Sequence, residues 1–270
     1  MTIDNGFSFD GRHTLADMGL IYVPAGTRPL IAPRRVVSYT IAGMSGTRAY
    51  GDASVADVCT ETGVLYSAGD LRSETEARAL WRRVAAWLTV GRRQLIRDSE
   101  PDLYVIAEAM QLHMSEYGWL DGGLQVTWQW QPYHWQRTQT MLAGAELTAA
   151  VPTMARWVTM DTGRPAPVTV QVAVTGADAL TGLDVTVGSK RATLTGLELA
   201  AGDALEISME DPIGATITAA DGSLSSALPC MVRLEELLIP AAGTGVSVTA
   251  TFAGDGGVAQ VRLMARGCWE

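Results

Sequence analysis

Cysteine, histidine and lysine are scarce in this sequence, which has 3 Cys, 3 His and a single lysine, Lys190, in 270 residues. The cysteines lie far apart and form no C-x-x-C pair, so neither a disulfide framework nor a zinc site is predicted. The histidines His13, His113 and His134 are too dispersed for any known metal-binding motif. No metal ion is therefore expected, and a reducing compartment is the expected place of folding.

Positive charge is also in deficit, since 20 basic residues stand against 29 acidic ones and give a formal net charge of −9. This balance argues against a broad nucleic-acid-binding surface. No apolar run approaches the length of about 18 residues that a bilayer crossing requires. The first residues carry neither the basic nor the apolar region of a secretory signal. We therefore expect a protein without a membrane span that is made and folded in the cytoplasm.

Motifs for catalysis or cofactor binding are missing as well. The glycine-rich segments Gly243–Gly245 and Gly254–Gly257 match no phosphate-binding loop and are typical of hairpin turns, and no G-x-S-x-G motif occurs. Carboxylates cluster at residues 98–102 and 235–236, and a glycosidase needs only two of them. Both clusters have the composition of solvated turns. No catalytic residue and no cofactor are therefore predicted, and a glycosidase is kept only as a third hypothesis.

The stretch Leu124–Gln131 is the most regular pattern in the chain. Leu124, Val126, Trp128 and Trp130 alternate with polar residues, which is the period of a half-buried strand. Pro132 follows and cannot donate to a ladder, so the strand is predicted to end there. Burial in a core is the ordinary outcome for the two tryptophans. We interpret this strand as the last one of a first domain.

The first domain is predicted over residues 1–135 as a β-sandwich with one packed α-helix, an α+β arrangement. The helix is predicted over residues 73–90, because Ser73 and Glu76 form an S-x-x-E capping box. Apolar residues then recur at three- and four-residue spacing as far as Leu88, and Gly91 indicates the end of the helix.

Residues 136–164 are predicted to be a connector with at most one strand, at Arg156–Met160. From residue 165 to residue 270 the pattern is β only, with at least seven short strands and turns such as Asp221–Gly222. Strands and turns at this spacing predict a second β-sandwich. The fold class is therefore mainly β, in two domains.

Aromatic residues outside the strand pattern are the candidate interaction sites: Trp119, Tyr133, Trp135 and Trp157. They are suited to interdomain or intersubunit contacts. Tyr133 and Trp135, with Pro132, are also predicted to form the hinge between the domains. The alternative is a stacking platform for sugars, because β-sandwiches commonly bind carbohydrates.

Seven fragments of the first domain, in this order, resemble the distal tail protein family of bacteriophages with long, non-contractile tails. They span residues 7–11, 18–20, 34–46, 70–72, 91–96, 100–104 and 126–133, and include Phe7-Ser-Phe-Asp-Gly11, Glu100-Pro-Asp-Leu-Tyr104 and Val126-Thr-Trp-Gln-Trp-Gln-Pro-Tyr133. Residues 165–269 resemble the second domain of that family, a galectin-like β-sandwich, more by pattern than by motif. The end of the chain, Arg266-Gly-Cys-Trp-Glu270, departs from the arginine and aromatic run with which the family often closes.

The resemblance implies a structural virion protein at the tail tip. In that family, six copies form a ring that joins the tail tube protein above to the tail-associated hub protein or baseplate below. The ring leaves a channel for the tape measure protein and DNA, and the first domains form it while the second domains project outward. The alternative hypothesis is a carbohydrate-binding adhesin module, whose partner would be host cell-wall carbohydrate.

Overall fold

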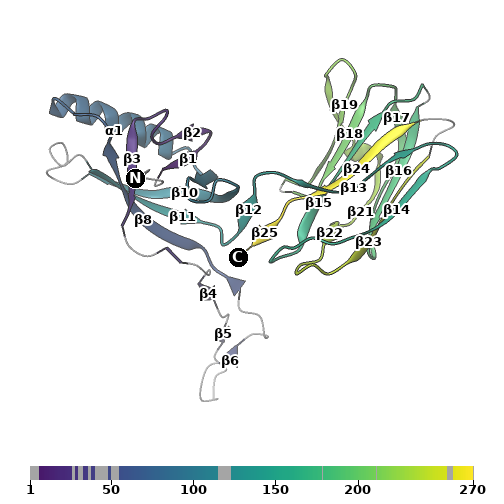
Figure 1. Cartoon of the computed structure of the whole chain (residues 1–270), viewed down its shortest axis with the longest axis horizontal. Coiled ribbons are helices and arrows are strands. Elements are labelled where there is room, and N and C mark those ends of the chain that lie inside the picture. The colour runs from purple at the N-terminus through teal and green to yellow at the C-terminus, as the bar shows by residue number, and fades with distance from the viewer. Residues whose placement is uncertain are drawn as a thin grey trace. The chain divides into compact units, whose positions relative to one another are not determined.

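The computed structural model describes residues 6–25, 28–29, 33–35, 38–39, 48–49, 55–114, 123–177, 179–210, 212–253 and 258–269. The chain divides into two compact units, Met1–Trp135 with Glu270, and Gln136–Trp269. Figure 1 shows that the described residues of both units form mostly strands and that helix α1 belongs to the first unit. The predicted mainly β fold is confirmed.

One large sheet forms most of unit 1. Its strands lie in the order β2 (Arg12–His13), β1 (Phe7–Phe9), β9 (Arg93–Arg97), β10 (Leu103–Met114), β11 (Gly123–Trp130), β8 (Cys59–Ser67) and β3 (Leu20–Pro24), and β12 (His134–Gln136) pairs with β10. Two short ladders join β4 (Arg34–Arg35) to β7 (Val55–Ala56) and β5 (Ser38–Tyr39) to β6 (Arg48–Ala49). The sheet curls around its core, because the rings of Phe7 in β1 and Tyr22 in β3 lie 5.1 Å apart although these strands are near opposite ends of the order.

The predicted strand around the two tryptophans is β11, in the middle of this sheet. Leu124, Val126, Trp128 and Trp130 are all buried, and the residues between them are exposed or half-buried. The strand pairs with β10 on one side and β8 on the other. The alternation was therefore a correct guide to both the strand and its buried face.

Helix α1 (Glu74–Leu88) covers the core of unit 1. Ser73 caps it by accepting a hydrogen bond from the Glu76 backbone N–H at 3.2 Å, while the Glu76 carboxylate accepts from the backbone N–H of Arg72. Trp87 stacks on Phe7 at 5.8 Å and donates its indole N–H to the carbonyl of Phe9. The helix is thus fixed to β1 by an aromatic contact and a hydrogen bond.

Unit 2 is a β-sandwich with a single core. One sheet has the order β13 (Thr140–Leu147), β24 (Ala259–Ala265), β15 (Ala166–Val174), β18 (Ala204–Ser208), β19 (Gly214–Thr218) and β20 (Leu224–Ser226), with β22 (Leu238–Ile239) paired to β15. The other has the order β14 (Thr153–Val158), β23 (Val246–Ala253), β16 (Leu180–Val187), β17 (Lys190–Leu199) and β21 (Met231–Leu234). The 3-10 helix η1 (Leu228–Cys230) precedes β21, and β25 (Cys268–Trp269) follows β24. Alternating side chains of both sheets fill one core.

Residues 136–164 are not a simple connector, and that prediction is wrong. They contain β13 and β14, which pair with β24 and β23 and so form one edge of each sheet of the sandwich. The strand pattern of β13 is weak in the sequence because the strand contains several small residues. A bulge near Met141 and Ala143 also interrupts its alternation. Arg156–Met160 was the strand expected here, whereas β14 begins at Thr153 and ends at Val158.

Candidate functional site

A buried ion pair lies where β8, β9 and β11 of unit 1 meet. The Arg97 guanidinium donates to Glu61 at 2.8 Å and lies 4.9 Å from the centre of the Trp130 ring. The hydroxyl of Tyr22 donates to the same carboxylate at 3.0 Å. Gly63 makes room for this arrangement, since a Cβ at that position would lie 2.2 Å from the Tyr22 ring. Glu61 on β8 therefore contacts both β3, through Tyr22, and β9, through Arg97.

Burial sets the ionisation of this ion pair's neighbours. It raises the pKa of Tyr22, and the charge of Glu61 raises it further, so the phenol remains a neutral donor. Burial also lowers the pKa of Arg97, but the adjacent Glu61 carboxylate opposes this effect and keeps the guanidinium charged. The cluster holds opposite charges in satisfied contacts, which is typical of a structural rather than a catalytic group.

The segment that leaves β11 is held to unit 1 by a second polar group. Arg28 donates to Glu100 at 2.5 Å and contacts Nε2 of His134 at 3.1 Å. The backbone N–H of Gln131 donates to the carbonyl of Ile106 at 3.0 Å. Burial and then the charge of Arg28 lower the pKa of His134, so its ring is neutral at pH 7. Burial alone would raise the pKa of Glu100, but the hydrogen bond and charge of Arg28 lower it.

Of the four aromatic candidates, Tyr133 and Trp135 lie in this same segment. Their rings meet edge to face with centroids 6.4 Å apart, both residues are half-buried, and Pro132 before them is buried. Trp157 lies far from them in the chain, on β14, where 72% of its surface is exposed and its indole covers Gly245. Trp119 lies outside the described residues. The structure therefore brings two of the four together.

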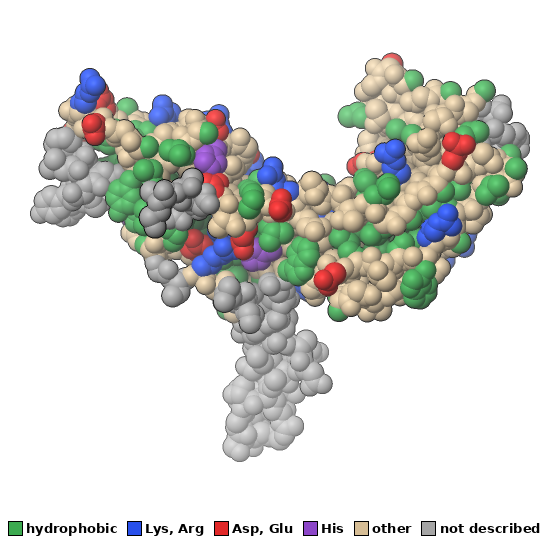
Figure 2. Space-filling model, viewed as in Figure 1, with side chains coloured by type: hydrophobic (Ala, Val, Ile, Leu, Met, Phe, Trp, Pro, Cys, Tyr) green, Lys and Arg blue, Asp and Glu red, His purple; other side chains and the backbone are tan. Residues whose placement is uncertain are grey.

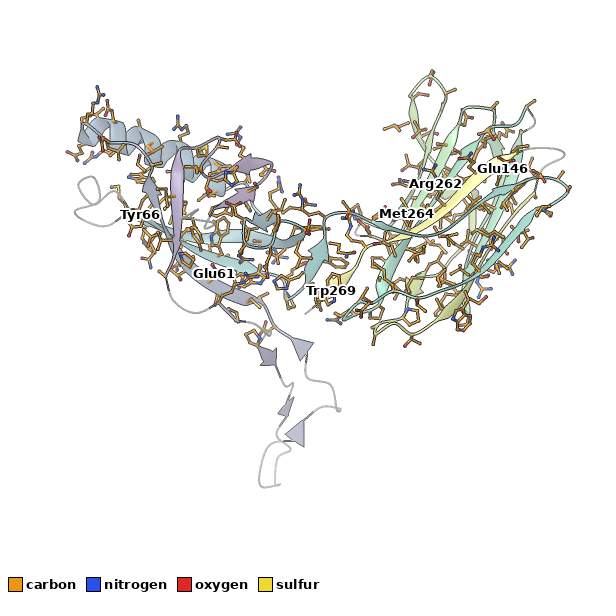
Figure 3. The ribbon with its side chains drawn as sticks, viewed as in Figure 1. Glu61, Tyr66, Glu146, Arg262, Met264 and Trp269 are labelled. Carbon is orange, nitrogen blue, oxygen red and sulfur yellow. The ribbon has the colours of Figure 1, made fainter. Side chains whose placement is uncertain are left out.

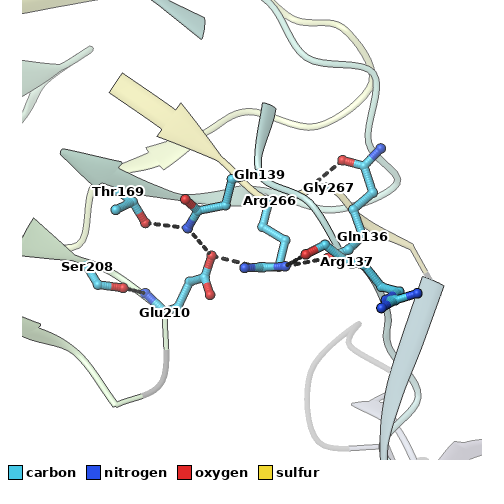
Figure 4. Close-up of polar contacts among 8 residues, drawn as sticks. All are labelled: Gln136, Arg137, Gln139, Thr169, Ser208, Glu210, Arg266 and Gly267. Atoms are coloured by element: carbon cyan, nitrogen blue, oxygen red, sulfur yellow. Dashed lines mark hydrogen bonds and ion pairs between the residues drawn. The ribbon is translucent and has the colours of Figure 1, made fainter. Parts of the chain in front are cut away.

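Arg266 fastens the beginning of unit 2 to the sandwich, as Figure 4 shows. Its Nη1 donates to the backbone carbonyls of Gln136 and Arg137 at 2.7 and 2.6 Å. Its Nε donates to the carboxylate of Glu210 at 2.9 Å. The Gln139 amide, in turn, donates to the same Glu210 oxygen at 2.8 Å. We call Arg266, Glu210, Gln136, Arg137 and Gln139 the Arg266 latch.

The Arg266 latch is joined to the face of the sheet. Gln139 also donates to the hydroxyl of Thr169 on β15, and Thr169 is buried although it points away from the core. The backbone N–H of Gly267 donates to the side chain of Gln136, and the Gln136 N–H donates back to the Gly267 carbonyl. A side chain at Gly267 would collide with Gln136 and Trp269. The latch thus fixes the first residues of unit 2 by several contacts at once.

An apolar edge lies on unit 2 where its two sheets end. Strand β20 is the last of one sheet and β21 the last of the other, and the described residues of both strands are mostly exposed. Large apolar side chains are exposed on these strands and next to them: Ile213, Leu224, Leu228, Val232 and Leu234. A group of exposed apolar side chains on sheet edges is typical of a surface that another protein covers.

Three carboxylates of the predicted clusters pair with basic side chains. Asp98 lies 3.0 Å from Nε2 of His13, Glu100 pairs with Arg28, and Glu235 pairs with Arg233 at 3.2 Å. Among the described residues, no group of three or more His, Cys, Asp or Glu could hold a metal ion. In the same part of the chain, no helix is long and apolar enough to cross a membrane. Asp98, Glu100 and Glu235 thus make ion pairs or hydrogen bonds within the fold.

Comparison of the sequence with models of known protein families gives no match. A sequence comparison with characterised proteins also gives none. The structure, however, is similar to solved phage proteins. Similarity to SPP1 Dit, a protein of the hub adsorption apparatus of phages that infect Gram-positive bacteria, has a TM-score of 0.67 at 11% identity and covers 97% of this chain and 98% of that one.

Two structures of the phage P2 baseplate in its activated conformation contain similar chains. The structure with Ca matches with a TM-score of 0.56 at 8% identity over 97% of this chain and 98% of that one. The structure with Sr matches with a TM-score of 0.54 at 8% identity over 97% of both chains. These similarities extend over both units. The chain therefore has the fold of a Dit-like hub and baseplate protein, as its sequence fragments indicated.

Proposed function

We propose that this chain is a structural, non-enzymatic protein that forms a six-membered ring at the distal end of a phage tail. The ring joins the tail tube to the tail-tip hub or baseplate and leaves a central channel for the tape measure protein and DNA. The observation that carries the proposal is the similarity to SPP1 Dit over nearly the whole length of both chains. A fold shared across two units is a stronger argument than a shared single sandwich, which serves many functions.

The charge of the chain is compatible with such a channel. A surface that DNA must pass should not attract phosphate, and the chain carries a net charge of −9. Figure 2 shows basic and acidic side chains interspersed on the visible face of the described residues, without a large basic patch. A ring of identical subunits also needs two different surfaces on each copy, because its contacts are heterologous.

The residues on each side of the boundary between the units are anchored to their own unit. On one side Arg28 holds His134, and on the other Arg266 holds Gln136 and Arg137. Both anchors are charge-assisted hydrogen bonds, which are roughly twice as strong as neutral ones.

The adhesin hypothesis based on tryptophans receives less support. Trp157 is 72% exposed and its indole lies close to Gly245, but it stands apart from Tyr133 and Trp135, which are half-buried against each other. The similarity over both units supports the ring and gives no support to sugar binding. The ring proposal is therefore preferred.

The test has two parts. Light scattering during size-exclusion chromatography of the purified chain should detect a species with six times the mass of the monomer, and electron microscopy should show it as a ring. Deletion of its coding sequence from the phage should yield tails that lack the tip complex. A deletion phage with intact tail tips, or virions that do not contain the chain, would rule out the proposal whatever the state of the isolated protein.

A further inference from the structure

A hollow of about 380 Å³ lies in unit 1 between α1 and the adjoining ends of β3 and β8. Two charged residues of α1, Glu76 and Arg83, stand at this hollow. Its apolar lining consists of Met18, Leu71, Ala79 and Leu80. Apolar residues with charged ones at their rim are typical of a surface on which part of another chain rests.

Arg83 is the charge at the hollow that a partner can use. The Glu76 carboxylate already accepts a hydrogen bond from the backbone N–H of Arg72 at 2.9 Å. Arg83 is exposed and forms no ion pair with a described residue, whereas Arg78 pairs with Glu74 on the same helix. These two glutamates of α1 disfavour a polyanion such as nucleic acid. The hollow therefore suits an apolar side chain that is followed by a single carboxylate.

The turn between β9 and β10 offers this combination. Pro101 and Asp102 are exposed on it, and Asp102 forms no ion pair within the described part of the chain. The turn has a fixed shape, because the backbone N–H of Glu100 donates to the Arg97 carbonyl and that of Leu103 donates to the Glu100 carbonyl. An apolar ring and a carboxylate are thus presented side by side.

The hollow and this turn lie far enough apart on unit 1 to contact different neighbours. Ser67, at the hollow, is the last residue of β8, whereas Glu61 of the same strand contacts Arg97, just before the turn. Figure 3 labels Glu61 and Tyr66, the neighbour of Ser67, at these two positions along β8. At about 3.4 Å per residue, the strand covers roughly 20 Å from Glu61 to Ser67.

Charge complementarity supports a second copy of the chain as the occupant of the hollow. The whole chain has a net charge of −9, so two copies repel each other unless surfaces of opposite charge meet. Residues 72–93 contain six arginines and two glutamates, which give +4, whereas residues 98–102 contain three acidic residues and no basic one. The same chain thus supplies both the basic surface and the acidic one.

We propose that the hollow beside Arg83 binds the β9–β10 turn of a second copy of this chain. Pro101 enters the apolar lining, and Asp102 accepts charge-assisted hydrogen bonds from Arg83. Each copy uses the hollow towards one neighbour and the turn towards the other, which is the heterologous contact that a ring requires. The inference rests on the proposed ring and identifies the residues through which its copies meet.

The experiment supplies full-length variants in trans to a phage that lacks the gene of this chain and measures their copies per virion. Arg83→Glu and Asp102→Arg should each lower incorporation about tenfold or more, because like charges then face each other. The double variant should recover most of the wild-type level, since the charges are exchanged. Arg156→Glu is the matched control and should be incorporated normally, because this exposed arginine of unit 2 bonds only to its neighbour's carbonyl among the described residues.

Cross-linking in virions is the second measurement. With Arg83→Cys and Asp102→Cys in one chain, a short bis-maleimide should join neighbouring copies into a ladder of up to six chains, whereas either cysteine alone should not. A bis-maleimide is used because an arginine and its partner carboxylate can lie too far apart for a disulfide. Thermal unfolding of every variant should match the wild type, since both positions are exposed.

Normal incorporation of Arg83→Glu would overturn the inference, and so would a paired-cysteine variant that cross-links no more than the single ones. Normal incorporation of Arg83→Glu together with lost binding to double-stranded DNA would make α1 a nucleic-acid surface instead. A wild-type chain that is absent from tail tips would refute the ring itself, so the two failures are distinguishable.

Discussion

Replacement of Arg266 by methionine tests how unit 2 holds its first residues. The change keeps the length of the stem but removes the hydrogen bonds to two backbone carbonyls and to Glu210. It also leaves the Glu210 carboxylate, whose side chain is 25% exposed, without its cation. Each charge-assisted hydrogen bond is worth about 1.5–3 kcal/mol, and water compensates for part of the loss. We expect the free energy needed to open the latch to fall by about 2–4 kcal/mol.

The assay is hydrogen exchange measured by mass spectrometry on the peptide that contains Gln136. The amide of Gln136 donates to Gly267, so its exchange reports opening of the latch. A loss of 2–4 kcal/mol corresponds to roughly 30- to 700-fold faster exchange. Arg262→Met is the control, because it removes an exposed arginine of β24, the strand that ends just before Arg266. Substitutions of exposed residues usually change stability by no more than about 0.5 kcal/mol.

A second substitution separates charge from packing at this latch. If the unpaired carboxylate causes part of the loss, Glu210→Gln in the Arg266→Met background should recover about 1 kcal/mol, because an uncompensated charge is removed. Exchange at Gln136 in Arg266→Met that equals that of Arg262→Met would refute the assigned role of Arg266.

Three other predictions concern unit 1 and the apolar edge. Glu61→Leu and Arg97→Met should each cost about 3–5 kcal/mol in urea unfolding, because each leaves a buried charge unpaired, whereas the double variant should cost less than the sum; additive losses would contradict the pairing. The pKa of His134 lies below its ordinary value of 6.5, so as pH falls below 6.5 the unfolded chain gains a proton before the native one does, and stability falls. His134→Gln should remove this slope, and an unchanged pH profile would contradict it. Val232→Glu, on the apolar edge, should leave the unfolding temperature within the error of the wild type but reduce incorporation into virions, with Thr181→Glu as control; normal incorporation would show that the edge is not covered.

Local signals in the sequence were sufficient where a residue's role depends on its near neighbours in the chain. The period of two in Leu124–Trp130 predicted both the strand β11 and its buried face. Ser73 was identified as the cap of α1, and the accepted hydrogen bond from Glu76 confirms it. Such features can be predicted from the sequence because they depend on periodicity and on hydrogen bonds between residues close together in the chain.

Weak alternation caused the main error of the fold prediction. Strand β13 has alanine and glycine where other strands have valine or leucine, and its bulge shifts the register after Met141. Its place in the sheet comes from pairing with β24, more than 100 residues later in the chain. Propensity over a short window contains no information about such a partner, so a strand of small residues resembled a linker.

The candidate sites were harder to predict, because the residues that form them are distant in sequence. Arg266 meets Glu210 across 56 positions and Gln136 across 130, and Glu61 meets Arg97 across 36. Arginine and glutamate are usually solvated, so no single position reveals that it belongs to a buried pair. Aromatic residues are conspicuous in the sequence because of their size, yet Trp128 and Trp130 fill the core. The residues on each side of the unit boundary are held within their own units by arginine hydrogen bonds. The latch and the buried ion pair are built from such distant partners, and their loss should be measurable without loss of the fold.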